Sequence, residues 1–191
     1  MVNAAHHRFS FAEYVDLVED SRVKLEFLDG QVWAMSGGSP DHARVTANVT
    51  TLLTAALRGK PYAVYSPDLR VRSKATGLGT YADVTVICGR VELDSDDPRR
   101  HTALNPRVVV EVLSPSTDEY DRGAKLEHYK TILSLEEIVL VAHDKQEIAI
   151  VRREAETWST HVVREHGTVT LLSLDVSLPL DEVYRDPLAT A

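Results

Sequence analysis

A glutamate inside an apolar run sets the strongest constraint on how this chain can fold. Residues 107–113 read Arg-Val-Val-Val-Glu-Val-Leu. A short run of this kind is typical of a β-strand that is buried on both faces of a sheet. A carboxylate in such a strand costs several kcal/mol unless a cation, a metal ion or hydrogen-bond donors meet it. Glu111 is therefore the first candidate for a chemical role.

A second apolar run carries one acidic residue in the same way. Residues 81–88 predict a strand interrupted only by Asp83. If the two strands are neighbours, both carboxylates can converge on one side of the sheet, and Mg²⁺ typically binds one or two protein carboxylates together with water and phosphate. The pattern predicts a metal site. The structural alternative is that Glu111 forms an ion pair with Arg107 or Lys125.

Three residues that follow the Glu111 strand in the sequence share one face of a predicted helix. Asp121, Lys125 and Tyr129 have the spacing i, i+4 and i+8 within a predicted helix that runs to about residue 133. A lysine beside two carboxylates and a metal could orient a water or stabilise charge on a phosphate. The alternatives are an acid favoured by the helix dipole, a solvated lysine and a core tyrosine.

The remaining patterns predict a single α/β or α+β domain over residues 1–191, built on one mixed β-sheet flanked by helices, with frayed tails at about 1–9 and 185–191. Asp29-Gly30 between two alternating runs indicates an N-terminal hairpin, and Ser10 with Glu13 has the spacing of a capping box. Further elements are expected as helices at about 10–18 and 42–57 and strands at about 23–28, 31–35, 62–73, 138–142, 147–152, 157–164 and 168–173.

Composition excludes several classes of protein. The net charge of −8 argues against a protein that coats nucleic acid non-specifically, although a local basic groove remains compatible with it. The single cysteine, Cys88, excludes an internal disulfide framework, fits a cytoplasmic protein and is interpreted as core packing. No apolar stretch reaches the roughly 18–20 residues that cross a bilayer, and the N-terminus has no apolar signal core.

Other candidate residues keep two interpretations each. Glu26 points either to solvent or to the site, and His42 either has a surface or capping role at a helix start or contacts a phosphate. Arg70, Arg72 and Lys74 form either a basic strip for a DNA backbone or a guarded sheet edge. Pro67-Asp68 is interpreted as a turn.

The motifs as a set resemble the Uma2 family of the PD-(D/E)XK, or restriction-endonuclease-like, superfamily. The resemblance covers about residues 10–180, and its most specific part is the string Glu-Val-Leu-Ser-Pro-Ser-Thr at 111–117 followed by the aspartate, lysine and tyrosine. It is carried by Glu26-Phe27-Leu28-Asp29-Gly30, Pro40-Asp41-His42, Tyr81-Ala82-Asp83-Val84, Val109 to Thr117, Asp121, Lys125 and Tyr129.

The resemblance implies a restriction-endonuclease-like core with a divalent-metal site. Asp83 and Glu111 would bind Mg²⁺ or Mn²⁺, Lys125 would be the catalytic lysine, and Glu26 would assist. Two positions depart from the superfamily pattern: Leu113 stands where the strand lysine would be, and Ala82 stands where proline usually precedes the aspartate.

The function expected from the residues and the resemblance is metal-dependent hydrolysis of DNA phosphodiester bonds, with a homodimer as a family-level expectation. The rivals are a catalytically silent nucleic-acid-binding or protein-binding module on the same fold and a metal-independent protein in which Asp83, Glu111 and Lys125 form a buried ion network.

Overall fold

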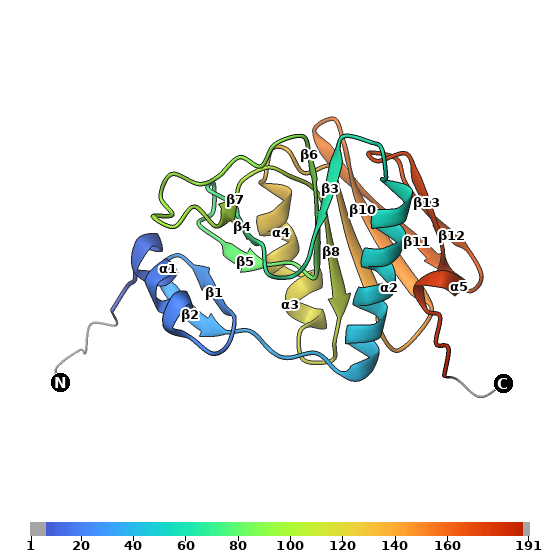
Figure 1. Cartoon of the computed structure of the whole chain (residues 1–191), viewed down its shortest axis with the longest axis horizontal. Coiled ribbons are helices and arrows are strands. Elements are labelled where there is room, and N and C mark those ends of the chain that lie inside the picture. The colour runs from blue at the N-terminus through green and yellow to red at the C-terminus, as the bar shows by residue number, and fades with distance from the viewer. Residues whose placement is uncertain (1–6, 189–191) are drawn as a thin grey trace.

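The strand that carries Glu111 lies inside a six-stranded mixed sheet. A computed structural model describes residues 7–188, and Figure 1 shows the arrangement of its elements. All residues of the Glu111 strand except Arg107 are buried, as expected for a strand covered on both faces. The order is β11 (Thr157–Arg164), β10 (Glu147–Glu154), β9 (Glu137–Ala142), β8 (Pro106–Leu113), β6 (Val84–Cys88) and β3 (Tyr62–Tyr65).

Helices cover both faces of this sheet, and alternate residues of β8 divide between them. Val108, Val110 and Val112 pack with α2 (Pro40–Ala56), together with β12 (Thr168–Leu171), β13 (Val176–Pro179) and α5 (Leu180–Val183). Val109 and Leu113 pack on the other face with α4 (Ala124–Lys130), which follows α3 (Asp118–Arg122). Glu111 alternates with the second set, so its side chain is directed to the α3–α4 side.

A second sheet of five strands carries the N-terminal hairpin (Figure 1). Asp29 and Gly30 both have positive φ, as a two-residue hairpin turn with this sequence requires, and α1 (Phe11–Asp20) begins with the predicted capping box at Ser10. The order is β2 (Gln31–Ala34), β1 (Leu25–Leu28), β5 (Gly79–Tyr81), β4 (Arg70–Arg72) and β7 (Thr102–Ala103).

The expectation of one sheet was therefore wrong, and so was the single strand over 81–88. Tyr81 ends β5 in the five-stranded sheet, and Val84 begins β6 in the six-stranded sheet. Asp83 lies in the bend between them. Its Oδ2 accepts the N–H of Val112 at 2.7 Å. The pairing of β6 with β8 ends at Val84 and Val110, so Val112 lies beyond it. The carboxylate thus supplies the hydrogen bond that the sheet no longer provides at this point.

Other expectations need smaller corrections. Segment 62–73 is likewise two strands in two sheets, and the helix expected after residue 115 is broken at Gly123, where a Cβ would lie 2.8 Å from the carbonyl oxygen of Glu119. Cys88 is exposed at the end of β6 and is not core packing. The sequence patterns also missed β13 and α5.

The ends of the described chain are tied to the body. Phe9 donates its N–H to Gly30, and Asn48 donates to the carbonyl of Arg185. The rest of the predicted frayed tails, residues 1–6 and 189–191, lies outside the described residues. Of the helices in residues 7–188, none combines the length and the apolar composition that crossing a bilayer requires.

Candidate functional site

A cavity of about 300 Å³ collects the predicted acidic residues and the lysine from five different segments. Glu111 comes from β8, Asp83 from the bend before β6, and Glu26 from β1. Asp121 and Lys125 come from α3 and α4. The structure therefore brings together side chains that lie up to 99 positions apart in the sequence.

Glu111 and Lys125 form a buried ion pair at the centre of the cavity. Their exposed fractions are 4% and 3%, and Lys125 Nζ lies 3.0 Å from Glu111 Oε1 and 3.3 Å from Asp121 Oδ1. The hydroxyl of Tyr129 donates to Glu111 Oε1 at 2.5 Å. The predicted face of Asp121, Lys125 and Tyr129 is therefore confirmed as a spatial group, even though Gly123 interrupts the helix.

Burial controls the protonation of this pair. It raises the pKa of Glu111 to about 8, with the nearby charges of Asp83 and Asp121 acting in the same direction and Lys125 opposing them. Burial alone would lower the pKa of Lys125, but the charges of Glu111 and Asp121 outweigh it and raise that pKa above its usual value. The buried carboxylate is thus incompletely compensated by the one lysine.

Asp83 is held by a backbone donor and a histidine. Besides Val112 N–H, its Oδ2 lies 3.3 Å from Nε2 of His42, in the first turn of α2. The hydrogen bond to Asp83 raises the pKa of His42, against the effect of burial. Gly38 packs against the ring, because a Cβ at that position would lie 2.5 Å from His42 Nδ1. His42 therefore faces the site and is not a surface residue.

Glu26 also points into the site, which the sequence had left open. It is 2% exposed, and the hydroxyls of Thr80 and Tyr120 donate to its two carboxylate oxygens. The sequence reasoning missed both hydroxyl residues. Neither Thr80 nor Tyr120 carries a local signal that links it to Glu26, which lies 54 and 94 positions away in the chain.

The donor set fits a divalent cation. Four carboxylates line the cavity, from Glu26, Asp83, Glu111 and Asp121, whereas its cationic side chains are Lys125 and His42. The contacts above use one oxygen each of Asp83 and Glu111. Within residues 7–188 no three His, Cys, Asp or Glu side chains are already arranged as a ligand set. Two carboxylates are nevertheless sufficient for Mg²⁺, which keeps several waters.

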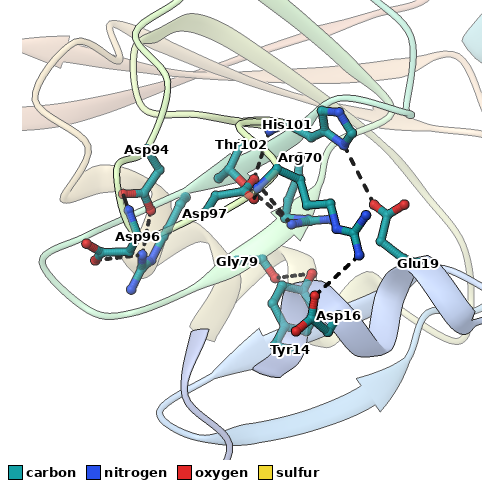
Figure 2. Close-up of polar contacts among 12 residues, drawn as sticks. Tyr14, Asp16, Glu19, Arg70, Gly79, Asp94, Asp96, Asp97, His101 and Thr102 are labelled. Carbon is teal, nitrogen blue, oxygen red and sulfur yellow. Dashed lines mark hydrogen bonds and ion pairs between the residues drawn. The ribbon is translucent and has the colours of Figure 1, made fainter. Parts of the chain in front are cut away.

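Two of the three residues of the predicted basic strip are covered by a loop. Arg70 is 2% exposed and lies 3.6 Å from Asp97, while Arg72 and Lys74 both contact Asp94 and Asp96. Figure 2 shows Arg70 with the three aspartates, which come from the loop before β7. The expected exposure was therefore wrong for Arg70 and Arg72, because that loop folds over them, whereas Lys74 is 45% exposed and its contact with a DNA backbone stays a prediction. Pro67-Asp68 lies in a turn, with Asp68 3.0 Å from Lys24.

Comparisons with known proteins identify a family and several similar proteins. A family model described as "Uma2: Putative restriction endonuclease" matches residues 11–181. Two proteins of Synechocystis sp. (strain ATCC 27184 / PCC 6803 / Kazusa), both described as uncharacterized, are similar. One is 32% identical over 188 residues, covering 96% of this chain and 95% of its own length. The other is 30% identical over 141 residues, covering 74% and 78%.

A solved structure shares the fold. The crystal structure of "a putative nuclease belonging to DUF820 from Anabaena variabilis ATCC 29413" superposes with a TM-score of 0.70 and covers 89% of this chain and 96% of that one. At 16% identity, this likeness shows the fold alone. Together with the family match, it confirms the predicted restriction-endonuclease-like fold class with mixed sheets flanked by helices.

Proposed function

The chain belongs to the Uma2 family, and from that membership together with the acidic cavity we propose that the protein is a Mg²⁺-dependent endonuclease that hydrolyses DNA phosphodiester bonds. The observation that carries the proposal is the charge of the cavity. Glu111 is buried beside Asp83, Asp121 and Glu26 with one lysine in contact. A divalent cation is the group that such a set of carboxylates lacks.

The roles of the side chains follow from their contacts. Asp83 and Glu111 would hold the ion, each with the oxygen left over from its protein contacts. Mg²⁺ at this position lowers the pKa of bound water and polarises phosphate oxygens. Lys125, fixed by Glu111 and Asp121, offers its remaining N–H to a phosphate oxygen or to the attacking water.

The supporting residues keep this geometry. Tyr129 fixes one oxygen of Glu111, and His42 fixes one oxygen of Asp83. Glu26 is held by two hydroxyls, so it is directed to the cavity in one orientation and can contact a metal-bound water. Such fixed orientation is what positions reacting groups without loss of entropy during the reaction.

The test is cleavage of plasmid and labelled linear DNA with Mg²⁺ and Mn²⁺, using wild type, Asp83→Asn and Glu111→Gln. We expect each variant to lose at least about a hundredfold in rate. Asp175→Asn is the matched control, because this exposed aspartate contacts Lys60 at 3.7 Å and lines neither the cavity nor the cleft beside it. Its rate should equal that of wild type.

Thermal unfolding separates the enzyme from a silent module. At about 100 times its Kd, Mg²⁺ should stabilise wild type by about 2.7 kcal/mol and leave Asp83→Asn and Glu111→Gln unchanged. If wild type neither cleaves DNA nor gains stability from the metal, the proposal is wrong, and the buried acids form a structural network.

A further inference from the structure

One exposed tryptophan at the mouth of the cavity has no place in the proposed chemistry. In the β1–β2 hairpin, Trp33 is directly opposite Glu26, so both side chains lie on the same face, and both line the cavity. Their strand neighbours Val32 and Phe27 are also opposite each other and pack on α1. Trp33 is 36% exposed, whereas the other tryptophan, Trp158, is stacked under the guanidinium of Arg153 at 4.5 Å.

The cavity continues past His42 into a second, larger cleft. This cleft has a volume of about 750 Å³ and runs along α2, whose residues Thr46 and Thr50 line it. Lys24, which directly precedes β1, also lines it. His42 and Asp83 line both spaces. A chain of nucleotides with its phosphate at Asp83 therefore has room on both sides, with Trp33 on one side and the α2 cleft on the other.

The cations of this path are already neutralised. Within the described chain, the cationic side chains that line the two spaces are Lys24, Lys125 and His42. Lys24 lies 3.0 Å from Asp68, and the other two contact acids of the site. Duplex binding depends on many phosphate contacts and counterion release, which such a surface supplies poorly. Stacking of an unpaired base on an aromatic ring contributes binding free energy in addition to any phosphate contacts, and a base within a duplex cannot make that contact.

We propose that Trp33 is a stacking platform for an unpaired base next to the scissile phosphate, so that the substrate is single-stranded or locally unpaired DNA. This inference rests on the proposed nuclease function, because only a nuclease would cleave the bound DNA. Binding of the base to Trp33 can be measured independently of cleavage. The base would enter beside Glu26, and its phosphate would reach Asp83 and Glu111.

The experiment uses the full chain carrying Trp158→Phe, in which Trp33 is the only tryptophan. A chelator is present so that binding is measured without cleavage. Single-stranded oligonucleotides and blunt duplexes of the same sequence are titrated while Trp33 fluorescence is followed. We expect saturable quenching by the single strand and at least tenfold weaker binding of the duplex. Unchanged fluorescence, or equal affinity for the duplex, would overturn the inference.

Two further variants isolate stacking from mere proximity. Trp33→Leu should weaken single-strand binding, measured by anisotropy of a labelled oligonucleotide, about tenfold, whereas Trp33→Tyr, which keeps an aromatic face, should stay within about threefold of wild type. Both residues suit an exposed strand position, and circular dichroism checks the fold. If Trp33→Leu binds and cleaves as wild type does, the stacking inference is wrong and the nuclease proposal stands. If the single strand quenches Trp33 but is never cleaved, the stacking inference is supported and the nuclease proposal is wrong.

Discussion

The molecule contains two clusters of ion-paired side chains that differ in their balance of charge. One cluster surrounds Asp94, Asp96 and Asp97, which Figure 2 labels together with Arg70. Arg70, Arg72 and Lys74 contact these acids, so three cations meet three acids. The cavity cluster has four acids and two cationic side chains.

Their surroundings differ as well as their charge. Asp97 accepts hydrogen bonds from the N–H groups of Arg99 and His101 and from the hydroxyl of Thr102, all within its own loop. Asp83 and Glu111 instead border an open cavity. In a charge-balanced cluster each buried charge has a partner that offsets its loss of hydration, whereas an acid-rich cluster beside a cavity is destabilised until a cation binds. The balance of acids and cations therefore distinguishes these two clusters better than the burial of their side chains does.

Removing Arg70 should give the largest effect on the fold. Arg70→Met leaves the carboxylate of Asp97 buried without its cation, and it removes the donors to Tyr81 and Thr102. We expect a loss of about 3–5 kcal/mol in the free energy of unfolding, measured by urea denaturation. DNA cleavage per folded molecule should remain at the wild-type rate. A hundredfold loss of activity at equal folded fraction would break the comparison, because it would place this cluster in the site.

A pH titration should sharpen the same contrast. Burial raises the pKa of Asp97, but the hydrogen bonds from Thr102, Arg99 and His101 outweigh it and hold that pKa below its usual value. A carboxyl with a lowered pKa in the folded state contributes stability above its unfolded pKa of about 3.9, and this is lost as the pH falls through the folded value.

Asp97→Asn should accordingly cost about 2 kcal/mol near neutral pH, through the loss of charge-assisted hydrogen bonds. The difference in unfolding free energy between Asp97→Asn and wild type should become smaller below about pH 4. Urea denaturation across the pH range measures it. The exposed Asp175 offers the control, since Asp175→Asn removes a carboxylate at a 3.7 Å surface contact with Lys60 and should change little. A difference between wild type and Asp97→Asn that stays constant down to pH 3 would show that the charge of Asp97 is not what stabilises the loop.

The sequence predicted the centre of the site because the information there is local. Glu111 stands out in its own strand, and Lys125 and Tyr129 follow it at helical spacing on the next element. The residues remain grouped although Gly123 breaks the helix. The hairpin was predicted for the same reason, since Asp29-Gly30 specifies its turn.

What the sequence could not predict depends on contacts between distant segments. An unbroken apolar run gives no sign that the chain changes sheet at Asp83, because each half has the pattern of a strand. Arg70 and Arg72 alternate as exposed cations would, and only the packing of residues 94–97 over them makes them structural. The position of Trp33 opposite Glu26 could have been predicted, because a two-residue turn fixes their pairing.

The prediction with the smallest effect on stability tests whether the loop before α2 positions His42 and Asp83. Gly38 and Gly37 are adjacent in the loop before α2, but a Cβ on Gly38 would lie 2.5 Å from His42 Nδ1, while a Cβ on Gly37 meets nothing within 4 Å. Gly38→Ala must therefore move the imidazole that holds Asp83, and Gly37→Ala need not. We expect both to change unfolding free energy by less than about 1 kcal/mol. Only Gly38→Ala should lower cleavage about tenfold and raise the Mg²⁺ concentration for half-maximal rate. Equal behaviour of the two alanine variants would mean that His42 does not position Asp83, and the acid-rich cluster would then need no support from α2.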